Sequence, residues 1–284
     1  MEVRRPAVAG QFYEGDAQAL RNSIRECFLN RLGPGSLPPS AKYESVVGMV
    51  SPHAGYVYSG PIAAHGYYVC SQMKGIELVV ILGPNHWGLG SGVATVKAGV
   101  WRTPLGDVEV DADAAKDLVQ SSKIVDFSED AHLREHSIEV QLPFLQFIYG
   151  AGFKLLPICM LMQDKRTASE VADALLSVIE KRKALLVASS DFTHYEDHRS
   201  ASEKDRRLIE SILGLDIDGL YDTLERLNVS ACGYGPIAVV MNVVKRLGCK
   251  EGRLLKYATS GDVTGDYGAV VGYASIIFVL RESS

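Results

Sequence analysis

The chain has 284 residues, of which 47% are hydrophobic and 22% charged, and its formal net charge is -5 at pH 7. These proportions are typical of a soluble globular protein, and they provide no excess of positive charge for binding nucleic acid. The N-terminal residues 1–6 lack the apolar core of a signal peptide, and the most apolar late stretch, residues 269–280, is shorter than the roughly 20 residues that span a bilayer. We therefore expect neither a nucleic-acid partner nor a membrane.

Cysteine usage indicates the cellular compartment. The chain has five cysteines, an odd number without a Cys-x-x-Cys pair, so neither a disulfide framework nor a structural zinc site is predicted. We expect a cytoplasmic protein. Cys232 lies in a Gly/Pro-rich turn, whereas the other cysteines lie in apolar or helical contexts and are interpreted as structural.

Helices and strands alternate along the chain. The first predicted helix covers residues 16–32, because Leu20, Ile24 and Phe28 recur at helical spacing after a capping residue, Asp16. Further helices are expected at 59–73, 111–119 (capped by Asp111), 136–149, 169–181, 201–213, 216–227 and 237–247. Strands are expected at 46–50, 78–82, 93–97, 107–110, 155–159, 184–189, 254–259 and 269–280. This alternation predicts one α/β domain over residues 1–284, with a central mixed β-sheet flanked by helices.

Three of the predicted buried strands are each followed by a histidine. His53, His86 and His194 come just after the strands at 46–50, 78–82 and 184–189. Open α/β sheets bind ligands beyond the carboxyl ends of their strands. One loop histidine is equally compatible with a structural hydrogen bond, but three at equivalent positions indicate a functional site.

These residue types are suited to a metal centre. Imidazoles from separate segments suit iron, copper or zinc, so we expect His53 and His86 to be ligands. Cys232 is a candidate third ligand, although a buried inert thiol is equally compatible with its context. Asp191 could orient a histidine, and His194 could bind the metal or act as a general acid or base.

Other motifs allow alternative interpretations. Residues 132–136 match H-x-x-E-H, the inverted zinc-peptidase motif. The match straddles a predicted helix start and no third ligand follows at helical spacing, so a peptidase ranks second. In the last loop, Asp262 and Asp266 either support turns or line the pocket. His65 and His198 are interpreted as non-functional.

Together these motifs resemble the Memo family, nearly from end to end. The matching segments are residues 5–13 (RPAVAGQFY), 52–56 (PHAGY), 82–86 (LGPNH), 103–107 (TPLGD), 135–144 (EHSIEVQLPF), 190–194 (SDFTH), 232–233 (CG) and 260–267 (SGDVTGDY). The resemblance assigns His136 and Glu139 to a family helix motif rather than to a peptidase. His136, Glu139, Tyr56 and Asp262 are then expected in or around the pocket.

The resemblance also implies a fold and a metal site. The Memo fold is similar to that of class III extradiol dioxygenases, non-haem iron enzymes that cleave catechols. By this resemblance His53 and His86 correspond to iron ligands and His194 to the acid/base histidine, while Cys232 stands where the dioxygenases have a glutamate. A thiolate is softer than a carboxylate and favours copper or a different iron chemistry, so ring cleavage is not carried over.

Two functions follow as hypotheses. The first is a redox enzyme with iron or copper held by His53, His86 and Cys232. The second is a non-catalytic binding or adaptor protein that keeps the pocket for a peptide or a small molecule. Bacterial and archaeal members belong to the AmmeMemoRadiSam set, which suggests radical-SAM and AMMECR-type proteins as partners.

Overall fold

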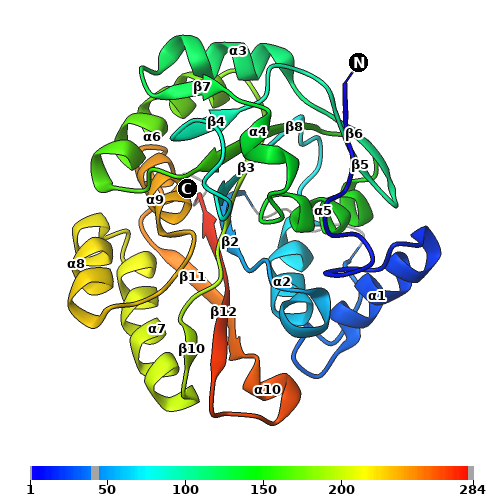
Figure 1. The fold of residues 1–284 in the computed structure, drawn as a ribbon, viewed down its shortest axis with the longest axis vertical. Coiled ribbons are helices and arrows are strands. Elements are labelled where there is room, and N and C mark those ends of the chain that lie inside the picture. The colour runs from blue at the N-terminus through cyan, green and yellow to red at the C-terminus, as the bar shows by residue number, and fades with distance from the viewer. Residues whose placement is uncertain (1, 40–44, 281–284) are drawn as a thin grey trace.

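A computed structural model describes residues 2–39 and 45–280 of the chain (Figure 1). Within these residues a nine-stranded mixed sheet has the order β10-β12-β2-β9-β3-β8-β4-β7, with β11 also paired to β12. Its strands are β2 (Val46–Ser51), β3 (Leu78–Pro84), β4 (Val93–Thr95), β7 (Val125–Phe127), β8 (Lys154–Met160), β9 (Ala184–Ser189), β10 (His194–Glu196), β11 (Gly252–Thr259) and β12 (Val270–Val279). A smaller sheet joins β1 (Val3–Arg4), β5 (Val100–Thr103) and β6 (Gly106–Glu109).

The centre of the large sheet is parallel. β2, β9, β3 and β8 run in the same direction, whereas β12 is antiparallel to β2 and β4 is antiparallel to β8. Ser51 pairs with Ser189, and Leu82 pairs with Ala188. The carboxyl ends of β2, β9 and β3 therefore reach the same edge of the sheet, and the loops that follow them meet there.

Helices cover both faces of the sheet. They are α1 (Ala17–Leu29), α2 (Tyr56–Cys70), α3 (Ala112–Ser121), α4 (Asp130–Leu133), α5 (Leu142–Tyr149), α6 (Lys165–Ile179), α7 (His198–Leu213), α8 (Ile217–Leu227), α9 (Tyr234–Arg246) and α10 (Gly261–Thr264). The side chains of Asp16 and Asp111 accept hydrogen bonds from the first turns of α1 and α3, as predicted. The expected fold, a mixed sheet flanked by helices, is confirmed.

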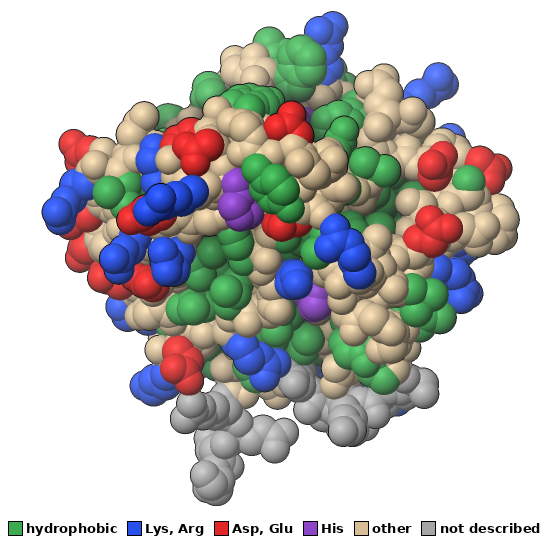
Figure 2. All heavy atoms as spheres, turned by 90° about the horizontal axis from the view of Figure 1, so that it is seen from below, with side chains coloured by type: hydrophobic (Ala, Val, Ile, Leu, Met, Phe, Trp, Pro, Cys, Tyr) green, Lys and Arg blue, Asp and Glu red, His purple; other side chains and the backbone are tan. Residues whose placement is uncertain are grey.

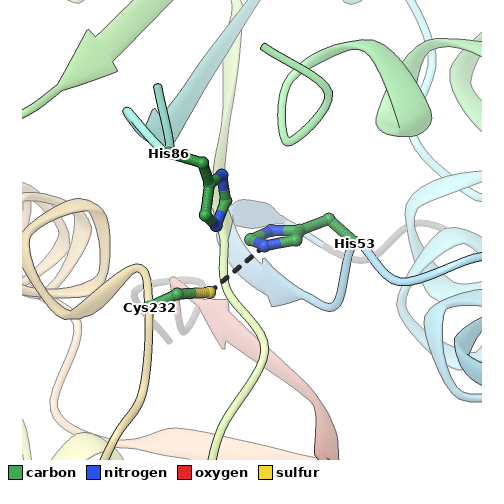
Figure 3. Close-up of side chains that lie close together, drawn as sticks. All are labelled: His53, His86 and Cys232. Atoms are coloured by element: carbon green, nitrogen blue, oxygen red, sulfur yellow. Dashed lines mark hydrogen bonds between the residues drawn. The ribbon is translucent and has the colours of Figure 1, made fainter. Parts of the chain in front are cut away.

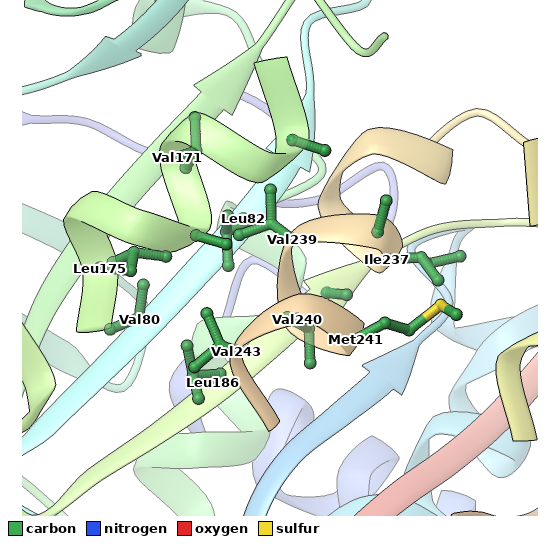
Figure 4. Close-up of a cluster of buried hydrophobic side chains, with 14 of the residues drawn as sticks. Val80, Leu82, Val171, Leu175, Leu186, Ile237, Val239, Val240, Met241 and Val243 are labelled. Carbon is green, nitrogen blue, oxygen red and sulfur yellow. The ribbon is translucent and has the colours of Figure 1, made fainter. Parts of the chain in front are cut away.

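Two hydrophobic cores lie on opposite faces of the sheet. Successive strand residues point to opposite faces, so Val80 and Leu82 of β3 pack with α6 and α9 (Figure 4). Val79 and Ile81 belong to the second core, with residues of α1, α2 and α5. Burying each large aliphatic side chain stabilises the fold by roughly 1.5–3 kcal/mol, so the two cores hold β3 and its following loop rigidly.

The predicted helix at 136–149 begins later than expected. A turn precedes a short 3-10 helix over Glu139–Gln141, and α5 starts only at Leu142. Pro143 lies in the first turn of α5, where its missing N–H costs nothing. The segment around His136 is therefore free to form a loop at the edge of the sheet.

The surface gives a mixed charge pattern. On the face drawn in Figure 2, basic and acidic side chains are interspersed, and histidine side chains reach the surface in two places. Among the described residues, none of the helices has the length and apolar character needed to cross a membrane.

Candidate metal centre

Three potential ligand atoms converge at the carboxyl edge of the sheet. His53 follows β2, His86 follows β3, and Cys232 precedes α9. The ligand atoms of these three side chains lie within 4.8 Å of one another, and His53 Nε2 is 3.1 Å from Cys232 Sγ. Figure 3 shows the three side chains pointing toward one point from three separate segments. His53 is buried, whereas His86 keeps 32% of its side chain exposed, so the centre opens to solvent on the side of His86.

The loop that carries Cys232 packs closely against β9. Cys232 N–H donates to Asp191 O at 3.2 Å, and Gly233 N–H donates to Ser190 Oγ at 2.9 Å. A Cβ atom on Gly233 would lie 2.3 Å from Ser189 O. Only glycine at this position lets the thiol approach the histidines so closely.

Both candidate imidazole ligands are oriented through their Nδ1 atoms. His53 Nδ1 is 2.9 Å from Ser189 Oγ. His86 Nδ1 is 2.9 Å from Glu135 Oε1, and His86 N–H donates to Glu135 Oε2 at 2.7 Å. This leaves both Nε2 atoms for a ligand, and such second contacts typically fix the ring of a metal-binding histidine.

Burial sets the protonation of the donors. It lowers the pKa of His53 well below the ordinary value, and the nearby imidazoles of His136, His86 and His194 lower it further, so His53 is neutral. Burial, aided by the carboxyl of Asp191, raises the pKa of the Cys232 thiol. A bound cation would reverse this preference and favour the thiolate.

Asp191 lies beside these donors. Its Oδ1 accepts a hydrogen bond from the backbone N–H of His53 at 2.8 Å, so it fixes the loop of His53 rather than its ring. Burial raises the pKa of Asp191 above its ordinary value, although the His53 N–H and the charge of His194 act in the opposite direction.

His194 begins β10 at the margin of the site. Its backbone N–H donates to Ser230 Oγ at 2.8 Å, and its Nδ1 is 2.9 Å from Ser230 O. Because a carbonyl oxygen only accepts, Nδ1 carries the proton and Nε2 is free. The next residue, Tyr195, has a left-handed backbone (φ 59°) and a 77% exposed side chain.

The other predicted pocket residues occupy different places. The His136 ring lies 4.7 Å from that of His86 and 5.3 Å from that of His53, so it lines the site. Buried Glu139 instead accepts hydrogen bonds from Ala7 N–H and Tyr13 Oη–H and pairs with Arg4, which ties down the N-terminal segment. Tyr56 donates to Val140 O within the core, and Asp262 accepts from Thr259 N–H in a local turn.

The H-x-x-E-H segment does not form a peptidase site. His132 is buried against the edge of Trp101, at 5.7 Å between ring centroids. His136 shares a possible donor group with Glu135 and His86 instead. His65 and His198 bind Leu32 O and Thr259 Oγ1 at 2.9 Å, away from these donors.

Comparison with known proteins identifies the family. The family model for Memo-like proteins matches residues 4–277. The chain belongs to the Memo family. A MEMO1 family protein of Methanopyrus kandleri is 54% identical over 278 residues, covering 97% of this chain and 98% of the relative. One from Methanocaldococcus jannaschii is 50% identical over 284 residues, covering 97% and 99%.

A solved structure supports the fold of this Memo-family chain. An uncharacterized protein from Escherichia coli K12 matches with a TM-score of 0.55 at 13% identity, covering 82% of this chain and 99% of the other. This likeness concerns the fold alone.

Sequence reasoning missed three residues around the donors: Glu135, Ser189 and Gln141. Glu135 appeared in the H-x-x-E-H pattern, and both Glu135 and Gln141 appeared in the family segment 135–144, but neither was given a role. Ser189 appeared only as the end of a predicted strand. The contacts of Glu135 and Ser189 with the histidines join segments 49 and 136 residues apart. No local sequence signal reports such contacts.

Proposed function

We propose that this Memo-family protein binds a redox-active transition metal, iron or copper, through His53, His86 and Cys232. The observation that carries the proposal is the convergence of their three donor atoms within 4.8 Å. The donor set fits such an ion, because the protein engages each imidazole through Nδ1, and His53 Nε2 faces Cys232 Sγ rather than another part of the protein. Imidazole and thiolate together suit iron, copper and zinc, and the thiolate favours a softer ion than a carboxylate would.

The bound metal would supply electron transfer and Lewis acidity to a small-molecule substrate. The chain's own residues would orient the ligands and move protons. Glu135 and Ser189 hold the two imidazoles, and Asp191 holds the loop of His53. His194, with its Nε2 free, acts as the general acid or base for a substrate at the margin of the site.

The test is metal content, measured by mass spectrometry on protein purified without oxygen. We expect near-stoichiometric iron or copper in the wild type and a large fall in His53→Ala, His86→Ala and Cys232→Ser. Cys249→Ser is the matched control, because this buried thiol lies outside the donor group and its loss leaves the three ligands intact. Full metal content in all three ligand variants would refute the proposal.

A binding or adaptor role is the second candidate. Large side chains are exposed close to the site histidines: Trp87 (53%), Tyr58 (42%) and Tyr195 (77%). Such exposed rings suit contact with a peptide or a small organic ligand. Metal-loaded protein that consumes neither oxygen nor peroxide with any of a panel of substrates would favour this role over catalysis.

A further inference from the structure

Ser189, the last residue of β9, connects His53 to a buried polar network. Its hydroxyl oxygen lies 2.6 Å from Ser137 O, 2.8 Å from Gln141 Nε2 and 2.9 Å from His53 Nδ1. Ser189 is fully buried and Gln141 is 1% exposed. The hydroxyl can donate one hydrogen bond and accept two, which matches its three neighbours.

The position of each proton in this network follows from what each atom can do. Ser137 O is a backbone carbonyl and only accepts, so the Ser189 hydroxyl donates to it. Gln141 Nε2 also lies 3.0 Å from Pro52 O, another pure acceptor, and Gln141 Oε1 lies 2.5 Å from Tyr67 Oη. Gln141 thus presents its NH₂ group to both Pro52 O and Ser189 Oγ, and its carbonyl oxygen to Tyr67.

The remaining contact fixes the tautomer of His53. Ser189 Oγ has given its only proton to Ser137 O and accepts one from Gln141, so it receives another from His53 Nδ1–H. His53 Nε2 then carries a lone pair, and it faces Cys232 Sγ at 3.1 Å. The opposite tautomer would set two acceptors, Ser189 Oγ and His53 Nδ1, against each other at 2.9 Å.

We propose that Ser189, held by Gln141, is a positioning residue that locks His53 as the Nδ1–H tautomer and so makes Nε2 the ligand atom. This inference rests on the proposed metal site for its purpose, but the tautomer itself is a property of the metal-free protein. A carboxylate, Glu135, sets the same tautomer in His86. The two candidate imidazole ligands therefore reach the same state by different chemistry, a neutral hydroxyl in one case and an anion in the other.

Two measurements test the proposal. The first is the ¹⁵N spectrum of histidine-labelled, metal-free protein, which distinguishes a protonated from an unprotonated ring nitrogen. We expect His53 to be protonated at Nδ1 in the wild type and to lose this preference in Ser189→Ala. The second is titration with cobalt(II), whose thiolate absorption reports binding next to Cys232; we expect affinity to fall about 10- to 100-fold in Ser189→Ala.

Two further variants separate positioning from folding. Ser275→Ala removes another fully buried serine hydroxyl, which lies on β12 and has no hydrogen-bond partner in this network, so the tautomer and the cobalt affinity should stay at wild-type values. Ser189→Thr keeps the hydroxyl and should restore the Nδ1–H signal. A wild-type spectrum with the proton on Nε2 overturns the proposal, even where Ser189→Ala fails to fold. Unchanged cobalt affinity in folded Ser189→Ala overturns the proposal as well. A wild-type protein that has the expected tautomer but binds no metal refutes only the proposed function.

Discussion

Glu135 is the buried anion that orients His86, and we expect its neutralisation to destabilise the protein in a pH-dependent way. It accepts hydrogen bonds from His86 N–H, from His86 Nδ1 and from Ser137 N–H at 2.7, 2.9 and 2.8 Å. Burial by itself would raise the pKa of Glu135, but the hydrogen bond from His86, the neighbouring imidazoles and Ser137 N–H hold it at about 2, below the ordinary 4.5. At about 1.4 kcal/mol per pKa unit, this difference corresponds to roughly 3 kcal/mol.

The sign of this contribution defines the experiment. Because the folded-state pKa is depressed, the stabilisation is complete above pH 4.5 and is lost as the pH falls toward 2. The free energy of unfolding of Glu135→Gln should therefore be about 3 kcal/mol lower than that of the wild type at pH 7. This difference between the two proteins should become smaller as the pH falls from 4.5 to 2. Denaturant unfolding of metal-free protein measures it, with the exposed Glu109→Gln as control. A difference that stays constant from pH 7 to 2.5 would refute the reasoning.

Two further predictions concern buried positions outside the donor group. Burial lowers the pKa of His132 to about 3, so folded protein should lose about 1.4 kcal/mol of stability per pH unit from this residue as the pH falls from 6.5 toward 3. His132→Phe, which keeps a ring against Trp101, should reduce the slope of the urea-unfolding free energy against pH by this amount. The same slope in the variant and the wild type would contradict the prediction. A Cβ on Gly272 would lie 1.9 Å from Asp205 Oδ2, so Gly272→Ala should lower the unfolding free energy by about 2–4 kcal/mol. Gly152→Ala, with its closest contact at 3.4 Å, should change it by less than about 1 kcal/mol in the same measurement.

The sequence predicted the central strands well because their patterns are local. β9 was predicted over the residues that form it, and the runs at 46–50 and 78–82 lie within β2 and β3. Buried parallel strands are continuous apolar runs, so they stand out in one sequence. β1, β5, β7 and β10, each of two to four residues, were missed because so few positions rarely show a pattern, although β4, with three residues, was predicted within 93–97.

The site residues that could be predicted are likewise those with a local sequence pattern. His53 and His86 could be found because parallel strands carry their following loops to one edge, so strand order alone brings them together. The prediction that Cys232 is a ligand rested on the family resemblance as much as on its Gly/Pro-rich turn. Glu139 was expected around the pocket; it acts electrostatically on His136, and its hydrogen bonds go to the N-terminal segment, including Tyr13. Which partner a buried carboxylate takes depends on the packing of distant segments, and no periodicity encodes it.

The protonation of the donors bears on the choice between the two proposed functions. Burial keeps His53 neutral and raises the pKa of the Cys232 thiol, so neither donor carries a charge in the metal-free protein. A surface that only recognises an apolar ligand needs neither group, since the exposed side chain of Trp87 already provides such contact. Under the proposed metal function, a cation would bind the imidazoles and stabilise the thiolate in the same step, with release of the thiol proton. Metal binding to the wild type should therefore weaken as the pH falls, whereas binding of an apolar ligand should not.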